Sequence, residues 1–235
     1  MISFIIPAHN EEFELPATLR TVREAADRVG CDYEIVVADD ASTDATVAIA
    51  QAAGARVVSF QRRQIAAARN AGAQAARGDI FIFVDADTHL GEEHIRGVQQ
   101  ALAAGCAGGG ALVAMDDETP SWGHRALKIF SAIYFRLGIG AGAFLFTTRE
   151  NFLASSGFDE RYFVGEEIYF SLALRQLGRF KILREPVTTS GRKLRLFKGR
   201  TLLWRSLVLI LSGPRGTMSR KKLDLWYGRE AREQV

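Results

Sequence analysis

The sequence predicts an α/β protein built on a doubly wound, mostly parallel sheet with helices on both faces. Strand-like and helix-like segments alternate through the first half of the chain. Acidic residues follow directly after predicted strands, at the edge where such sheets bind ligands. The 235 residues, of which 48% are hydrophobic and 24% charged, suffice for a sizeable core and exclude a mainly disordered chain.

Four short apolar runs predict the strands of the first half. They are residues 2–6, ended by Pro7, and residues 34–38, 56–60 and 80–84. Strands buried on both faces of a parallel sheet are continuously apolar, which is the pattern of these runs.

Three helices are expected between these strands. The first covers residues 15–29, where apolar side chains recur at intervals of three and four and Gly30 follows the last of them. The second covers residues 47–53, and we expect the side chains of residues 42–44 to cap it. The third is the alanine-rich segment 64–76.

The second half of the chain is less regular. Strands are expected at residues 108–115 and 144–147. Helices are expected at four places, which are residues 122–137, 166–177, 198–211 and 219–233.

Several features of the sequence bear on the cellular compartment in which the protein works. Cys31 and Cys106 are the two cysteines and form no CxxC pattern, so we expect neither a disulfide framework nor a structural zinc site. Residues 1–8 lack the basic start of a signal peptide, and no apolar run of about 18 residues predicts a membrane-spanning helix. These features favour the cytoplasm.

Three acidic clusters carry the candidate chemistry. They follow the second strand, follow the fourth strand and open a helix, and their members are Asp39, Asp40, Asp85, Asp87, Glu166 and Glu167. Carboxylate oxygens are hard ligands of the kind that Mg²⁺ and Mn²⁺ prefer. Any one cluster equally suits a turn or a favourable helix start, but three clusters at such ends favour a site.

Four motifs resemble those of inverting glycosyltransferases of family 2, which have the GT-A fold. They occur in the order typical of that family: IIPAHNEE at 5–12, VADDASTDAT at 37–46, AARNAGAQAARGDIFIFVDAD at 67–87 and GFDERYFVGEEIYFSLALRQLG at 157–178. The resemblance covers about residues 2–190. It implies a GT-A catalytic domain at residues 1–190, with a nucleotide-binding half at 1–115 and an acceptor half at 116–190. Residues 191–235 would form a basic helical extension.

The resemblance also implies roles for residues around the nucleoside. Pro7, Ala8 and His9 would line its pocket, and Glu11 would lie near the ribose. Asp39 would accept a hydrogen bond from the base.

Further residues are expected around the phosphates. Asp40 would brace its turn, and Arg69 would lie near the base or the phosphates. Asp87 would bind the Mn²⁺ or Mg²⁺ that bridges the diphosphate, while Asp85 would hold the ribose or complete the metal shell. Arg192, in a basic loop, would lie over the diphosphate or belong to an ordinary surface loop.

The reaction implied is transfer of a hexose-type sugar with inversion, from a UDP-sugar in preference to a GDP-sugar. A divalent cation would stabilise the departing diphosphate, and a carboxylate at a helix start would deprotonate the acceptor. Glu167 matches the family's catalytic base. The family commonly has Glu-Asp there, so the Glu-Glu pair leaves the choice between Glu166 and Glu167 open. The acceptor is unspecified, with a lipid-linked phosphate and a glycan as candidates.

Three alternatives are weaker. A non-catalytic sugar-nucleotide-binding protein would keep the same motifs. A receiver-type signalling domain needs an acidic pair after its first strand and a lysine after its fifth, whereas here the first strand ends in Pro7–Asn10 and the first lysine is Lys128. A nucleotidyltransferase would need a glycine-rich basic loop after the first strand, which is missing.

The C-terminal extension is strongly basic. Residues 191–235 hold 12 Lys and Arg against 3 acidic residues, a formal charge of +9, and the remaining residues carry −6. No nucleic-acid partner is expected, because the extension lacks a base-stacking aromatic pattern. It would either pack on the catalytic domain or bind anionic lipid at the inner face of the membrane.

The lipid interpretation predicts salt-sensitive vesicle binding. Each Lys or Arg near an anionic surface contributes about 1 kcal/mol, so the chain should sediment with anionic vesicles at low salt and dissociate as salt is raised. Neutral vesicles are the control. Equal sedimentation with anionic and neutral vesicles at low ionic strength would contradict the prediction.

Overall fold

The computed structural model of the chain describes residues 1–116, 138–192 and 218. Their strands form one eight-stranded sheet in the order β3-β2-β1-β4-β7-β6-β8-β5. The strands are β1 (Ile2–Ala8), β2 (Tyr33–Asp40), β3 (Arg56–Phe60), β4 (Ile80–Val84), β5 (Thr88–His89), β6 (Cys106–Met115), β7 (Phe144–Thr148) and β8 (Arg179–Thr189).

The sheet contains both parallel and antiparallel strand pairs. β1 pairs in parallel with β2 and β4, β2 pairs in parallel with β3, and β6 pairs in parallel with β8. β7 is antiparallel to both β4 and β6, and β5 is antiparallel to β8. Every described strand except β5 and β7 therefore runs the same way, which confirms the predicted mostly parallel sheet.

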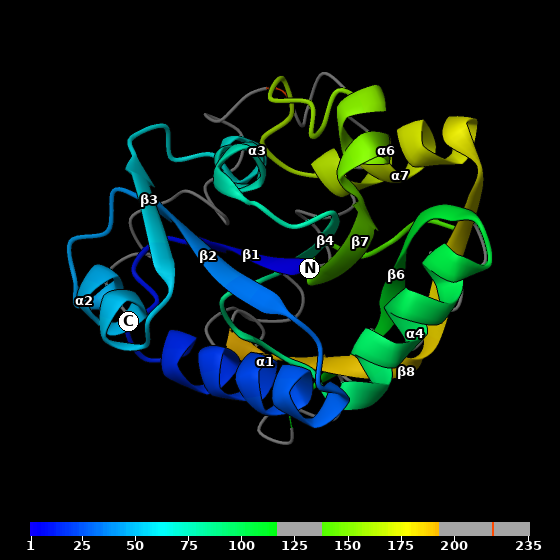
Figure 1. Ribbon diagram of the computed structural model, residues 1–235. Coiled ribbons are helices and arrows are strands. Elements are labelled where there is room, and N and C mark those ends of the chain that lie inside the picture. Colours follow the sequence, from blue (N-terminus) through cyan, green and yellow to red (C-terminus); the bar gives the residue numbers. More distant parts are fainter. Residues whose placement is uncertain (117–137, 193–217, 219–235) are drawn as a thin grey trace.

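Helices cover both faces of the sheet. The described helices are α1 (Leu15–Val29), α2 (Thr46–Ala52), α3 (Ile65–Ala75), α4 (Glu92–Ala103), α6 (Arg149–Ala154) and α7 (Glu166–Leu177). Figure 1 shows α1 and α4 below the sheet and α3, α6 and α7 above it. Two buried apolar clusters follow this division, one toward α1 and α4 and one toward α3, α6 and α7. Burial of both faces explains the continuously apolar strands.

Most predicted boundaries agree with the structure, but two strand ends were wrong. β2 continues to Asp40 instead of ending at Ala38, so Asp39 and Asp40 are its last residues and do not follow it. β1 does not stop before Pro7 and continues to Ala8, because Pro7 pairs with Ala38 of β2. The pairing of β1 with β4 has already ended at Ile5, so the missing N–H of Pro7 leaves no gap in that ladder.

The expected cap of α2 is made by Asp44, whose Oδ1 accepts a hydrogen bond from the N–H of Thr46, the first residue of the helix, at 3.0 Å. Ser42 makes no such bond to the helix. Ser42 and the second oxygen of Asp44 accept hydrogen bonds from the backbone N–H groups of Asn10 and Glu12, at 2.9 and 3.1 Å. The polar side chains therefore hold the loop after β1, which forms one wall of the cleft described below.

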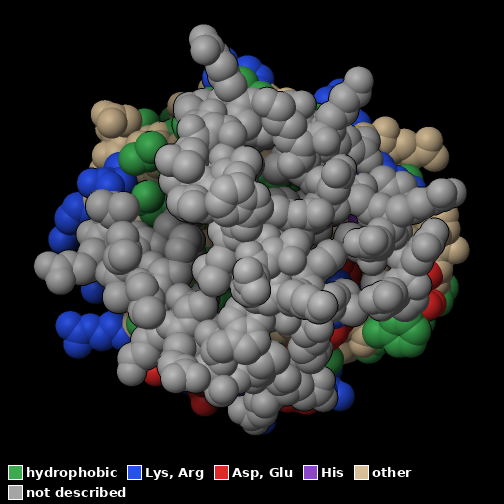
Figure 2. All heavy atoms as spheres, turned by 180° about the vertical axis from the view of Figure 1, so that it is seen from behind, with side chains coloured by type: hydrophobic (Ala, Val, Ile, Leu, Met, Phe, Trp, Pro, Cys, Tyr) green, Lys and Arg blue, Asp and Glu red, His purple; other side chains and the backbone are tan. Residues whose placement is uncertain are grey.

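Some predictions lie outside the described residues. These are the helices at 122–137, 198–211 and 219–233, and with them most of the basic extension. Within the described ranges, no helix is long and apolar enough to cross a membrane. Seen from behind, described basic side chains appear at several points around the rim, and acidic ones appear along the lower and right edges (Figure 2).

Candidate active site

A cleft of about 430 Å³ lies where β1 and β4 end. Because these strands are parallel neighbours, their carboxyl ends meet at one edge of the sheet. The cleft is lined by all the predicted site residues except Asp39, namely Pro7, Ala8, His9, Glu11, Arg69, Asp85, Asp87, Glu166, Glu167 and Arg192. The fold thus brings together motifs that are far apart in the sequence.

The two aspartates at the end of β2 differ in position. Asp39 is buried, lies beside Ala8 in the ladder and accepts a hydrogen bond from Ser42 N at 3.2 Å, and it does not line the cleft. Asp40 lines the cleft, and its two carboxylate oxygens accept hydrogen bonds from the N–H groups of Arg62 and Gln64 at 2.7 and 2.6 Å. Asp40 thereby braces the turn after β3.

An ion pair at the cleft joins the segment after β8 to the loop after β1. One nitrogen of Arg192, just beyond β8, lies 3.1 Å from both carboxylate oxygens of Glu11, which follows β1. Burial opposes the charge of Arg192, but the carboxylate of Glu11 raises its pKa above the ordinary value. A second bond links the same segment to the turn after β4, since the N–H of Ser190 donates to the carbonyl of Asp87 at 3.2 Å. The segment after β8 is therefore held over the end of β4.

Arg69 of α3 lies at the back of the cleft with a side chain that is 1% exposed. Its Nη1 donates to Glu166 Oε1 at 2.6 Å, and its Nη2 donates to Asp85 Oδ1 at 2.8 Å and to Gly142 O at 3.0 Å. Burial opposes the charge on Arg69, but the neighbouring carboxylates of Asp85 and Glu166 raise its pKa. A buried guanidinium needs such partners to offset its desolvation.

The start of α7 presents two carboxylates to different surroundings. Gly165 precedes the helix with φ 82°, a conformation that favours glycine, and Glu166 and Glu167 form the first turn. Both line the cleft, but Glu166 is 3% exposed and bonds to Arg69, whereas Glu167 is half-buried. Burial, and then the charge of Glu167, raise the pKa of Glu166 to about 8 against the opposing effect of Arg69.

The cleft has carboxylates suited to a divalent cation. Asp85 and Asp87 both line it, and Asp87 Oδ1 accepts a hydrogen bond from the Thr189 hydroxyl at 3.1 Å. Among the described residues, no group of three or more His, Cys, Asp or Glu is arranged to hold a metal ion. Two hard carboxylate ligands still suit Mg²⁺ or Mn²⁺, because these ions usually also bind water and substrate phosphates.

The sequence analysis missed other residues of the cleft. Arg63 and Gln64 follow β3 and line it, so the rule that ligands bind beyond strand ends could have found them. Arg63 has φ 50°, which places it in the left-handed region. Burial, together with the charge of Arg63, lowers the pKa of His9. Gly142 and Ala143 carry no side-chain chemistry that a sequence pattern could reveal.

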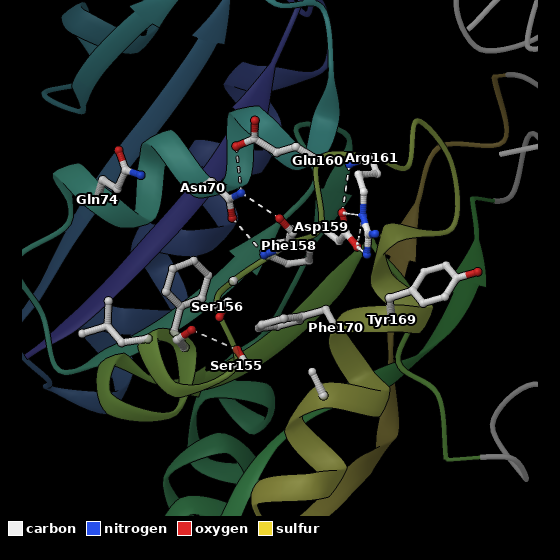
Figure 3. A pocket seen from close by; sticks show the side chains of 14 residues that line it. Asn70, Gln74, Ser155, Ser156, Phe158, Asp159, Glu160, Arg161, Tyr169 and Phe170 are labelled. Atoms are coloured by element: carbon white, nitrogen blue, oxygen red, sulfur yellow. Dashed lines mark hydrogen bonds and ion pairs between the residues drawn. The ribbon is translucent and has the colours of Figure 1, made fainter. Parts of the chain in front are cut away.

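A second hollow, of about 700 Å³, lies between α3, α6 and α7 (Figure 3). None of the predicted site residues lines it. Asn70 on its wall donates to Phe158 O and Glu160 Oε1 and accepts from Phe158 N, so this side chain bonds within the wall. We therefore place the candidate active site in the first cleft.

Comparison with protein families agrees with this geometry. The family model described as glycosyl transferase family 2 matches residues 3–158. The chain belongs to glycosyltransferase family 2. The match includes the ends of β1, β2 and β4 and stops before α7, so it contains Asp85 and Asp87 but neither Glu166 nor Glu167.

The curated relatives of this family 2 chain include an undecaprenyl-phosphate sugar transferase and a succinoglycan biosynthesis protein. It is 32% identical to the undecaprenyl-phosphate 4-deoxy-4-formamido-L-arabinose transferase of Pseudomonas aeruginosa (strain LESB58), over 55% of the chain and 41% of that protein. It is 30% identical to the succinoglycan biosynthesis protein ExoO of Rhizobium meliloti (strain 1021), over 81% of the chain and 57% of that protein. The chain therefore spans about half the length of these relatives.

Solved structures of glycosyltransferases share the fold. S. aureus TarS in complex with UDP-GlcNAc superposes with a TM-score of 0.65 at 17% identity, covering 81% of this chain and 58% of the other. The Pyrobaculum calidifontis mannosyltransferase PcManGT with GDP-Man and Mn²⁺ gives 0.63 at 20% identity, covering 87% and 59%. The GT-A fold that the resemblance implied is thereby confirmed.

Glu166 predicts a pH dependence of stability. Its pKa is raised in the folded protein, so the folded state binds more protons than the unfolded state between about pH 4.5 and 8. The free energy of unfolding should fall as pH rises through this window, by up to about 1.4 kcal/mol per pH unit. In Glu166→Gln this slope should be smaller, as measured by urea unfolding.

A control separates this effect from loss of any helix-start carboxylate. Glu150 is exposed in the first turn of α6 and does not line the cleft, so Glu150→Gln should keep the wild-type slope. Equal slopes for wild type and Glu166→Gln would contradict the prediction.

Proposed function

We propose that this family 2 domain transfers a sugar from a nucleotide-diphosphate donor to an acceptor with inversion, using a UDP-sugar in preference to a GDP-sugar. The observation that carries the proposal is the convergence of three chain segments, at Glu11, Asp85–Asp87 and Glu166–Glu167, on one cleft at the strand ends. The UDP-GlcNAc and GDP-Man complexes of structural neighbours support a nucleotide-sugar donor.

Glu167 is the base in this proposal. A base must reach the acceptor hydroxyl and be ionised at the working pH. Glu166 meets neither condition, because it is buried against Arg69 and its pKa is raised. Glu167 lines the cleft at the start of α7, where the helix dipole favours a negative charge.

The donor is assigned to residues at and just beyond the ends of β1, β4 and β8. Asp85 and Asp87 would hold Mn²⁺ or Mg²⁺, which would act as a Lewis acid on the diphosphate. Arg192 would leave Glu11 to contact the phosphates, and His9 and the backbone of Pro7 and Ala8 would line the nucleoside pocket. Arg69 is not assigned to the donor, since both of its terminal nitrogens bond to protein groups.

The acceptor proposed is a lipid-linked phosphate at the membrane surface. Relatives named undecaprenyl-phosphate transferases support it, as does the formal charge of +9 on residues 191–235. The domain would then work at the cytoplasmic face of the membrane. A glycan acceptor, which the similarity to ExoO favours, is the alternative.

A nucleotide panel tests the donor and the metal. UDP, GDP, CDP and dTDP are compared by thermal unfolding with and without Mn²⁺, and a ligand at 100 times its dissociation constant should add about 2.7 kcal/mol of stability. Asp87→Asn should lose the Mn²⁺-dependent part of this stabilisation, because a carboxylate ligand is gone.

The exposed Asp79, just before β4, provides the control, and Asp79→Asn should bind UDP as the wild type does. Full sugar transfer in EDTA would contradict the metal assignment. Nucleotide binding with no turnover of any sugar nucleotide would indicate the non-catalytic alternative.

Glu167→Gln tests the base. Turnover should fall by about 10²-fold or more while UDP affinity changes little, because the amide cannot accept the acceptor proton. The matched variant Glu166→Gln keeps a hydrogen-bonding side chain next to Arg69 and should lose less activity. A larger loss in Glu166→Gln than in Glu167→Gln would reverse the assignment.

A further inference from the structure

Arg69 contacts groups from three separate parts of the cleft. Its guanidinium bonds to Glu166 at the start of α7, to Asp85 at the end of β4 and to the carbonyl of Gly142 just before β7. The side chain itself comes from α3. The buried guanidinium of Arg69 therefore connects Asp85, on the proposed donor side of the cleft, to α7, the helix that carries the proposed base.

We propose that Arg69 is a positioning residue that holds Asp85 and the first turn of α7 at a set separation, so that Glu167 faces the donor. The inference rests on the proposed function, because that proposal assigns Asp85 to the donor side and Glu167 to the base. Arg69 contacts protein groups with both Nη1 and Nη2, and it acts through them.

The chemistry of the guanidinium suits this task. Its nitrogens form a rigid planar fork, so two carboxylates bonded to Nη1 and Nη2 are fixed relative to each other. A lysine ammonium is a single point charge on a flexible stem and cannot impose that separation. Removing the guanidinium would leave Asp85 without its counter-charge and Glu166 without its hydrogen-bond donor.

The surroundings hold the fork in place. The guanidinium lies 5.2 Å from the centroid of the Phe158 ring, and that ring stacks on Phe170 of α7 with centroids 4.1 Å apart. Asn70, next to Arg69 on α3, bonds to the backbone N–H and carbonyl of Phe158 (Figure 3). Stacking and hydrogen bonds thus orient the side chain before any ligand binds.

The two terminal nitrogens of Arg69 make all the described hydrogen bonds of its guanidinium. Arg69 Nε is buried and has no hydrogen-bond partner among the described residues. The contacts of this side chain with Glu166, Asp85 and Gly142 therefore depend on Nη1 and Nη2 alone.

Gly142 permits the close approach. A Cβ on this residue would lie 2.9 Å from Arg69 Nη2, closer than real Cβ atoms come to such a neighbour. Gly142→Ala therefore displaces the guanidinium without removing a charge or a carboxylate, and it tests position alone.

The experiment compares Arg69→Lys, Arg69→Met and Gly142→Ala with Arg149→Lys. Arg149 is the matched control, because it also bonds to backbone carbonyls, at Gly78 and Ala76, and lies 4.8 Å from a phenylalanine ring centroid, yet it does not line the cleft. Turnover is followed as release of UDP from UDP-glucose, or of GDP from GDP-mannose if the nucleotide panel favours GDP.

If Arg69 positions the reacting groups, its replacement should lower kcat and leave KM almost unchanged. Arg69→Lys and Gly142→Ala should lower kcat at least 10-fold while the KM for the donor stays within about 3-fold. Arg149→Lys should keep the wild-type kcat. A purely structural role would instead lower thermal stability in Arg69→Lys and Arg149→Lys alike and leave the kcat of the folded enzyme unchanged. Folded Arg69→Lys and Gly142→Ala variants with wild-type kcat would overturn the proposal.

A second measurement needs no substrate. Carboxylates are amidated with a carbodiimide and glycinamide, and labelled peptides are quantified by mass spectrometry. Glu166 should be protected in the wild type and react several-fold faster in Arg69→Met and in Gly142→Ala, and unchanged protection in both would refute the coupling. If the wild type neither binds nor hydrolyses any sugar nucleotide, the proposed function fails, while labelling still decides whether Arg69 holds Asp85 and the first turn of α7 together.

Discussion

Parallel pairing of β1 with β2 and β4 is the constraint on which the cleft depends. The register runs without interruption from Ile2 to Ala8 against β2, so the chain leaves both strands at the same level. The loop after β1 and the Asp85–Asp87 turn after β4 then have no other place to lie than one edge of the sheet. Helices on both faces stabilise this arrangement by burying the apolar strands.

Electrostatics imposes a second requirement at that edge. Six acidic side chains of the described residues line the cleft, namely Glu11, Asp40, Asp85, Asp87, Glu166 and Glu167, and a diphosphate would add negative charge. The structure offsets part of this charge from within, since Arg69 bonds to Asp85 and Glu166 and Arg192 bonds to Glu11. An anionic donor would still need cations, which supports both the proposed divalent metal and the proposed release of Arg192 from Glu11.

The two glutamates at the start of α7 illustrate how burial separates identical residues. They are adjacent in sequence, share the same helix dipole and both line the cleft, yet Glu166 is buried against the guanidinium of Arg69 and Glu167 is more exposed. Burial in low dielectric disfavours a charged carboxylate, so only the residue that reaches water and ligand suits a base. Local pattern cannot make this distinction, because it depends on which residue of α3 packs against the helix.

Sequence reasoning had clear limits within the fold as well. The helix α4 was not predicted, although its buried residues Ile95, Val98 and Ala101 recur at helical spacing and a stricter periodicity count would have found it. The reversed direction of β7 carries no such signal, because a buried strand has the same apolar pattern in either direction. That reversal matters for the cleft, since it brings the segment before β7, with Gly142, to the edge where Arg69 lies.

The sequence by itself determined the α/β class, the positions of most strands and the motifs that place the chain in its family. These depend on local periodicity and on residue types at strand ends, which are readable along the chain. Only the tertiary structure decided that Asp39 lies outside the cleft, that Ser42 and Asp44 hold the loop after β1, and that Arg69 joins Asp85 to Glu166. Those outcomes depend on contacts between residues 16 to 97 positions apart, and burial at such contacts sets both the charge and the direction of each side chain.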